Sequence, residues 1–158
     1  MKKYELTEET KVIDGKTLFR IRALRSFGDI KAGDLGGFIE NERNLSHGGN
    51  AWVGDNAQVG GNAQVGGDAW VDGDAWVDGD GLINSNNDDR CEKGLGSHNR
   101  SASFFKCKDG HIHVLCGCFS GNLDEFENKV KEEHGNSKYA KEYLGFIEVV
   151  KTHFEVRQ

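Results

Sequence analysis

The stretch "NAWVGDNAQVGGNAQVGGDAWVDGDAWVDGDG", residues 50–81, repeats one six-residue phrase and decides the expected fold. An apolar residue recurs every six positions, and a small residue stands two places before it. The apolar positions are Val53, Val59, Val65, Val71, Val77 and Ile83, and the small ones are Ala51, Ala57, Ala63, Ala69, Ala75 and Gly81. Because side chains alternate along a strand, both members of a pair face one side and the residue between them faces the other. Gly, Asp and Asn fill the corners, as tight turns require.

A short strand and a corner every six residues are typical of a parallel β-helix, in which three hexads of about 18 residues close one triangular coil. The hexads "VGDNAQ", "VGGNAQ", "VGGDAW" and "VDGDAW" resemble the left-handed hexapeptide-repeat family. The resemblance implies a left-handed parallel β-helix, assembly as a homotrimer, and ligands in the clefts between subunits. We expect this helix over residues 35–85, with the register extending backward through "HGGNAW", "NERNLS" and "LGGFIE". Residues 18 apart should stack, which places Trp52 on Trp70, Gln58 on Trp76 and Gln64 on Leu82.

Trp52, Trp70 and Trp76 occupy the outward slot, which folding leaves unconstrained because Gln58 and Gln64 fill it equally well. No Lys or Arg occurs between Asn44 and Asp89. Interface cores are enriched in aromatic residues and depleted in Lys, so packing between subunits is the favoured interpretation. A stacking platform for a base or sugar, and contact with the C-terminal part of the chain, remain alternatives.

The segments on either side of the repeat predict separate elements. Residues 1–34 predict an N-terminal β-hairpin cap around Asp14-Gly15. Its second strand carries Arg20 and Arg22, followed by Arg25, and these arginines either lie in water or form an anion site. Residues 86–100 predict a polar linker. Residues 101–158 predict a ββαα unit, with a hairpin around Asp109-Gly110 and a helix between Asn122 and Gly135, then a second helix from about Ser137. The expected fold is therefore mainly β with a small α+β end.

The sequence alone shows no complete set of metal ligands or of catalytic residues. On a strand through "HIHVLCGC", His111 and His113 face one side, whereas Cys116 and Cys118 face the other, so one tetrahedral metal cannot collect both pairs. The cysteines are interpreted as core residues, and the two histidines either bind a ligand or lie in water. The repeat holds only His47, which leaves zinc without a ligand set. Corner Asp residues fit turn chemistry without Ca²⁺. We expect no metal, no cofactor and no catalytic residue.

Composition narrows the class of partner. A net charge of −6 argues against binding duplex nucleic acid. No apolar run is long enough for a membrane helix or a signal peptide. Four cysteines without an export signal indicate reduced thiols, and therefore a soluble protein of the cytoplasm.

The motif "GDLGGFIE…NLS…GNAWV" is similar to a group of small β-helix proteins from bacteria, prophages and phages whose activity is not settled. That resemblance favours a non-enzymatic homotrimeric phage protein that sequesters a small anionic, nucleotide-derived ligand, such as an antiviral-defence signal, at subunit interfaces. Candidate ligand-binding residues are Arg20, Arg22, Arg25, Trp52, Trp70, Trp76, His111 and His113. Two alternatives stay open: a transferase-like enzyme of the hexapeptide superfamily with His47 or a C-terminal His as base, and a structural trimerisation module.

Overall fold

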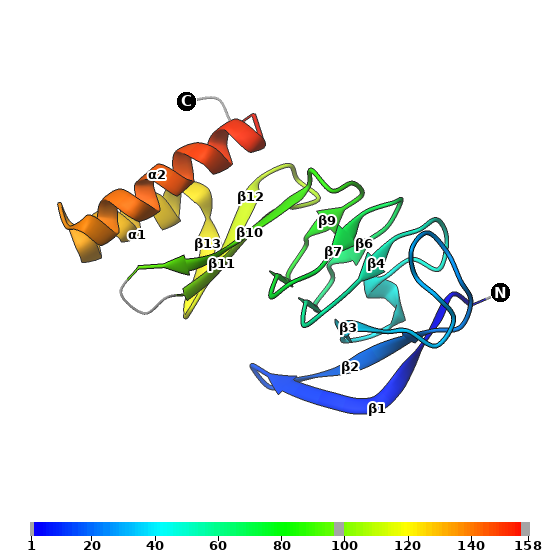
Figure 1. Ribbon diagram of the computed structural model, residues 1–158. Coiled ribbons are helices and arrows are strands. Elements are labelled where there is room, and N and C mark those ends of the chain that lie inside the picture. Colours follow the sequence, from blue (N-terminus) through cyan, green and yellow to red (C-terminus); the bar gives the residue numbers. More distant parts are fainter. Residues whose placement is uncertain (1, 97–99, 156–158) are drawn as a thin grey trace. The chain divides into compact units, whose positions relative to one another are not determined.

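The computed structural model describes residues 2–96 and 100–155. The chain divides between Asn86 and Asn87 into two compact units, which are best described separately (Figure 1).

The first unit begins with a long hairpin of β1 (Tyr4–Ile13) and β2 (Lys16–Ala23). Its two turn residues, Asp14 and Gly15, have φ values of 49° and 76°. Positive φ at both positions gives the turn twist that matches two-residue hairpins, and Asp-Gly tolerates it well. The predicted hairpin is therefore confirmed.

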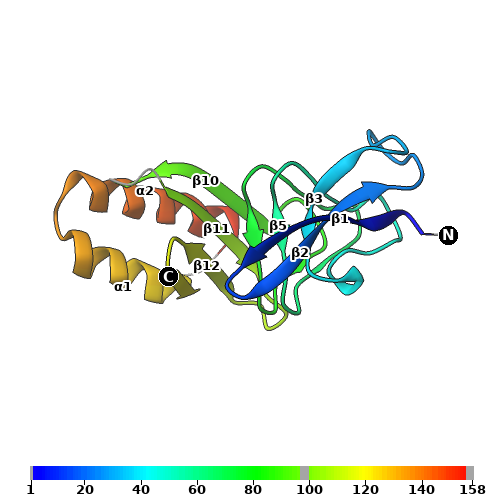
Figure 2. The ribbon, with the colours of Figure 1, turned by 90° about the horizontal axis from the view of Figure 1, so that it is seen from below.

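The hairpin continues into a larger sheet instead of forming a separate cap. Strand β2 pairs antiparallel with β3 (Leu35–Ile39), and β3 pairs parallel with β5 (Gln58–Val59). The resulting five-stranded sheet has the order β1-β2-β3-β5-β8 and contains both kinds of pairing (Figure 2). Gly36 and Gly37 allow β3 to lie against the repeat, because a Cβ on Gly37 would stand 2.5 Å from the Ala57 carbonyl oxygen.

The repeat forms two-residue strands that pair in parallel at a separation of 18 residues. Trp52 pairs with Trp70, Gln58 with Trp76, and Gln64 with Leu82. The strands are β4 (Trp52–Val53), β5, β6 (Gln64–Val65), β7 (Trp70–Val71), β8 (Trp76–Val77) and β9 (Leu82–Ile83). The Ala and Val positions are buried throughout. The expected stacking partners are thus the ones observed.

The expected left-handed parallel β-helix is nevertheless wrong as a description of the fold. Over the described residues the strands form a five-stranded mixed sheet and a four-stranded antiparallel sheet, and only two two-stranded sheets are purely parallel. The physical reason lies in β3, which pairs with β5 of the repeat on one edge and with β2 of the hairpin on the other. The sheet that begins in the repeat therefore continues into the hairpin. The repeat is one part of a mixed β unit and not a self-contained solenoid.

The register expected before Val53 is also wrong. Ile39 pairs with Val59, and Leu45 bridges to Val65. The two partners in each of these pairs are 20 residues apart in the sequence instead of 18. Two extra residues therefore lie between Leu45 and Val53, and His47 does not fill an apolar slot. A short 3-10 helix, Glu42–Asn44, precedes this insertion. Asn44 is buried there, and its amide donates to the Ala63 carbonyl at 2.8 Å.

Over its described residues, 87–96 and 100–155, the second unit is a four-stranded antiparallel sheet with two helices. Its strands are β10 (Asp89–Leu95), β11 (Arg100–Lys106), β12 (Ile112–Cys116) and β13 (Phe119–Asn122), in that spatial order. The expected linker over 86–100 is wrong because it contains β10, and the expected ββαα unit has four strands instead of two. This strand was missed because its sequence is polar: six of its seven residues are charged, glycine or cysteine, and only Leu95 is buried.

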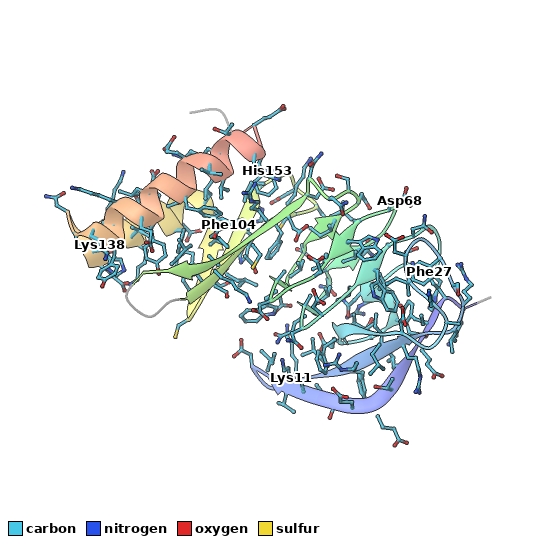
Figure 3. The ribbon with its side chains drawn as sticks, in the orientation of Figure 1. Lys11, Phe27, Asp68, Phe104, Lys138 and His153 are labelled. Atoms are coloured by element: carbon cyan, nitrogen blue, oxygen red, sulfur yellow. The ribbon has the colours of Figure 1, made fainter. Side chains whose placement is uncertain are left out.

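The helices α1 (Leu123–His134) and α2 (Lys138–His153) begin at the predicted residues. Asn122 and Glu125 form a reciprocal capping box at the start of α1, and Gly135 ends it with φ 55°. Both helices pack on the sheet face that carries Phe104, which lies between sheet and helices (Figure 3). Over the described residues, neither helix combines the length and apolar character that spanning a bilayer demands.

Candidate functional site

The three candidate arginines do not come together in the structure. Arg20 pairs with Glu9 at 2.6 Å and donates to the Gly36 carbonyl at 2.8 Å, while its guanidinium lies over the Phe38 ring. Arg22 pairs with Glu5 on β1 at 2.9 Å. Arg25 donates to the His47 carbonyl at 3.1 Å. Arg20 and Arg22 thus hold the N-terminal strands together, and Arg25 ties the segment after β2 to His47, so the contacts favour a structural role over an anion site.

The tryptophans are less exposed than their slot suggested. Trp52 is only 1% exposed, and Phe27 packs edge-on against it with ring centroids 5.3 Å apart. The prediction of an exposed Trp52–Trp70 pair is therefore wrong for Trp52, because β3 and the segment around Phe27 cover the first layer of the repeat. Trp70 and Trp76 are half-buried.

His47 is occupied by internal contacts. Its ring stacks on Tyr4 with centroids 4.1 Å apart, and its Nδ1 accepts the Lys3 backbone N–H at 3.1 Å. Its Nε2 lies 3.5 Å from Glu42. These contacts tie the N-terminus to the inserted segment and give His47 a structural role.

The second unit contains a cavity of about 550 Å³ between the β12–β13 hairpin and the two helices. Its apolar wall consists of Cys116, Phe119, Phe126, Val130 and Tyr143, and its polar rim of Cys118, Ser120, Lys129, Glu133 and His134. An apolar wall with a few polar groups, in a volume of about 300–1,000 Å³, is typical of small-molecule sites.

Local sequence explains why these residues meet. Gly117, at φ 59°, turns β12 tightly into β13, where Cys116 pairs with Phe119. Helix α1 begins directly after β13 at its capped Asn122, so the chain folds back over the hairpin. Phe126 and Val130 are four residues apart and therefore share the face that looks onto the strands. Lys129 and Glu133 occupy the neighbouring face, at the rim.

The wall is aromatic and ordered by ring contacts. Phe126 contacts Phe119 at 5.1 Å and Tyr143 at 5.9 Å between centroids. His134 stacks on Tyr143 with centroids 5.5 Å apart and an interplanar angle of 19°. The Tyr143 hydroxyl donates to the Leu95 carbonyl at 3.4 Å, which fixes the ring. The cavity thus has an aromatic wall, in which the rings of Phe119 and Tyr143 are inclined to that of Phe126 by 50° and 84°, with an imidazole at its margin.

The rim carries a protonated amine. Lys129 lies 3.1 Å from Glu133, one helical turn away. The hydrogen bond to Glu133 and the charge of this carboxylate raise the pKa of Lys129. The ammonium therefore remains charged at neutral pH and is exposed to solvent, where it can reach an anionic group on a bound molecule.

His111 and His113 lie close together in the same unit, as their spacing predicted. His111 Nε2 is 3.4 Å from His113 Nδ1, and Cys107 completes a group of three potential metal ligands. From the sequence, the histidines were weighed only together with Cys116 and Cys118, and a metal shared by both pairs was rejected. Cys107 was missed, although the spacing C-x-x-x-H-x-H across the Asp109-Gly110 turn pointed to it. Lys129, His134 and Tyr143 were missed because they meet only when α1, which carries the first two, packs beside α2, which carries Tyr143.

The resemblance to hexapeptide-repeat and phage β-helix groups stays a prediction. Neither a protein-family model nor a curated protein matches this chain.

Proposed function

We propose that this protein binds a small anionic molecule with a planar ring, such as a mononucleotide, in the cavity of its C-terminal unit. The observation that carries the proposal is the aromatic wall of Phe119, Phe126 and Tyr143 beside the charged Lys129 and the imidazole of His134. The class of ligand is the one expected from the sequence. The proposed binding site differs from the expected one, because Arg20 and Arg22 of the N-terminal hairpin are engaged in internal ion pairs.

Two physical arguments support this class of ligand. Aromatic side chains bind flat rings by offset stacking and exclude water from them. An ammonium at the rim adds charge attraction to a phosphate or carboxylate. Glu133 offsets part of this charge, so the ring supplies most of the affinity and Lys129 supplies the preference for an anion.

The wider biological role is a further part of the proposal. Homotrimeric assembly, a phage or prophage origin and capture of an antiviral-defence signal rest on the sequence resemblance and stay predictions. We also propose that the protein works in the cytoplasm, where its four cysteines remain reduced thiols.

Calorimetric titration with adenosine monophosphate, adenosine and inorganic phosphate tests the proposal. We expect adenosine monophosphate to bind more tightly than adenosine, and phosphate alone to bind weakest. Lys129→Gln should weaken the binding of adenosine monophosphate by roughly threefold, which is typical of losing an exposed ion pair, and should leave the binding of adenosine unchanged. Lys131→Gln is the matched control, because Lys131 lies on the same helix outside the cavity and pairs with Glu127.

Three outcomes would overturn the proposal: no binding of any of the three compounds, phosphate binding as tightly as the nucleotide, or equal effects of the two lysine variants. Mass spectrometry of the recovered nucleotide separates binding from the enzyme alternative. An intact nucleotide supports capture, and a converted one favours a transferase-like activity.

A further inference from the structure

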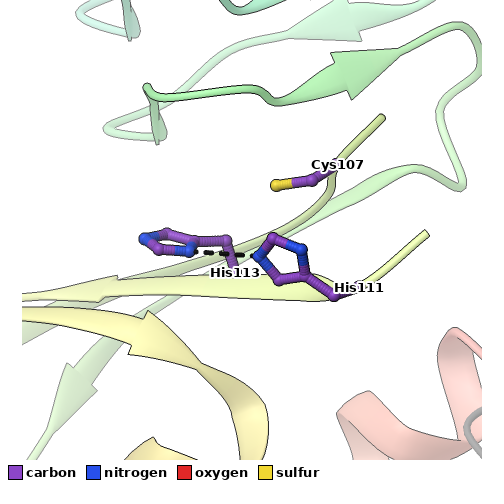
Figure 4. Close-up of side chains that lie close together, drawn as sticks. All are labelled: Cys107, His111 and His113. Carbon is purple, nitrogen blue, oxygen red and sulfur yellow. Dashed lines mark hydrogen bonds between the residues drawn. The ribbon is translucent and has the colours of Figure 1, made fainter. Parts of the chain in front are cut away.

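The turn between β11 and β12 brings together Cys107, His111 and His113, outside the cavity described above (Figure 4). Cys107 follows the last residue of β11, His111 stands just before β12, and His113 lies within it. The Cys107 N–H donates to the His111 carbonyl at 2.9 Å, and the Gly110 N–H donates to the Cys107 carbonyl at 2.9 Å. These bonds close a tight turn, so Cys107 and His111 lie side by side across the hairpin.

The two imidazole rings are oriented by partners on their outer nitrogens. His111 Nδ1 lies 2.5 Å from the Asp109 carboxylate, and His113 Nε2 lies 2.9 Å from the Ser120 hydroxyl. Asp109 also accepts the His111 backbone N–H at 2.9 Å, which fixes the carboxylate. A carboxylate or hydroxyl on the far nitrogen of a histidine is the arrangement that orients metal-binding imidazoles.

The inner nitrogens, His111 Nε2 and His113 Nδ1, face each other at 3.4 Å. Two nitrogens bound to one tetrahedral zinc ion lie about 3.4 Å apart, given zinc–nitrogen bonds of about 2.0–2.1 Å. The pair therefore already has the separation that a shared ion requires.

The Cys107 sulfur supplies the third ligand atom. All three ligand atoms lie within 4.8 Å of one another. A sulfur and a nitrogen on the same zinc ion are about 3.6 Å apart, so the group has to contract by no more than about 1 Å. His111 is exposed, so a small movement of its ring displaces no buried side chain.

We infer that the C-terminal unit binds a transition-metal ion of the Zn²⁺ class through Cys107 Sγ, His111 Nε2 and His113 Nδ1. Thiolate and imidazole ligands select zinc and related ions over Mg²⁺ and Ca²⁺, which prefer oxygen. Binding converts the Cys107 thiol to a thiolate, and its proton leaves to solvent. Ser120 both donates and accepts, so its hydroxyl can turn to accept from His113 Nε2 once Nδ1 binds the metal. Three protein ligands leave a fourth position for water or another small ligand.

Titration of the purified full chain with Co²⁺, followed by competition with Zn²⁺, tests this inference. We expect one Co²⁺ per chain, with the thiolate-to-cobalt charge-transfer absorption and the intense visible bands of tetrahedral coordination. Zn²⁺ should displace Co²⁺ and abolish both signals. Cys107→Ser should remove the charge-transfer band, and His111→Gln should weaken Co²⁺ binding at least tenfold.

Matched controls keep the test decisive. Cys118→Ser and His134→Gln each alter a Cys or His outside the cluster and should leave the spectrum unchanged. His111 is exposed, so His111→Gln reports on the site even where Cys107→Ser reduces folding, and circular dichroism checks the fold of each variant. Absence of stoichiometric binding, or a cobalt spectrum that survives both Cys107→Ser and His111→Gln, would overturn the inference.

Discussion

Lys3 shows how a single buried charge ties the N-terminus to the repeat. Its side chain is wholly buried, and its Nζ donates to the Ala51 carbonyl at 2.5 Å and the Gly48 carbonyl at 3.3 Å. Burial, and then the positive charge of Arg25, lower the pKa of Lys3 from 10.5 to about 8, while Asp68 opposes the shift. Between these two pH values the unfolded chain binds more protons than the folded one. The free energy of unfolding therefore rises with pH across this window.

Guanidinium denaturation at about pH 7.5 and about pH 9.5 tests this dependence. We expect the unmodified protein to gain stability at the higher pH, and Lys3→Met to lose most of that gain. Tyr4 stays protonated in the folded chain at both pH values, because burial raises its pKa. In the unfolded chain both pH values lie below the ordinary tyrosine pKa of about 10. Lys2→Met is the control, because Lys2 is exposed and pairs with Glu42. Equal pH slopes for the protein and Lys3→Met would show that Lys3 does not carry the effect.

Strand β3 is the element that turns the repeat into a mixed sheet. It fits only because Gly36 and Gly37 allow its backbone to approach Val53 and Ala57. A Cβ on Gly37 would lie 2.5 Å from the Ala57 carbonyl oxygen and 2.9 Å from Val53 Cγ1. Both neighbours belong to a packed core, so neither can move away cheaply.

Gly37→Ala is therefore expected to lower the free energy of unfolding by about 1–3 kcal/mol, as overpacking of a core does. Gly48→Ala serves as the control, since its nearest neighbour is Ser46 Oγ at 3.6 Å. That change should stay within about 0.5 kcal/mol. Urea denaturation of the two variants measures both values, and equal losses would argue against close docking of β3.

Local signals in the sequence predicted most of the elements. The Asp-Gly turns, the Asn122 cap and the 18-residue pairing each depend on residues that are near in sequence or strictly periodic. The predictions that failed depend on contacts between residues that are far apart in the sequence, or on a break in the repeat. The burial of Trp52 depends on Phe27, and the two residues inserted before Val53 have no periodic signature. The same holds for the site: the spacing of His111 and His113 was visible, whereas the cavity forms only when α1 and α2 cover the β12–β13 hairpin.

At the scale of the whole molecule, the homotrimer remains the main prediction from the sequence. With Trp52 buried, the half-buried Trp70 and Trp76 are the tryptophans left to contribute to an interface. Aromatic residues of this kind are enriched in interface cores. The repeat tolerates Gln in the same slot at Gln58 and Gln64, so substitution there should preserve folding.

Light scattering should give a particle of three 17.5 kDa chains for the unmodified protein. Trp70→Gln combined with Trp76→Gln should shift it toward the single chain, with an unchanged circular dichroism spectrum. A Gln64→Ala control alters the β6–β9 sheet, which carries neither tryptophan, and should leave the mass unchanged. A monomer in the unmodified protein would contradict the trimer, and a trimer in the double variant would exclude these tryptophans from its interface.

The central claim is that the ligand site lies in the C-terminal cavity and not on the N-terminal hairpin. Backbone amide chemical shifts recorded by NMR during titration with adenosine monophosphate test it most directly. We expect the largest shifts at the amides of Phe119, Lys129 and His134, and no shifts at the amides of Arg20 and Arg22. Shifts concentrated at Arg20, Arg22 and Trp70, with the cavity residues unmoved, would contradict it.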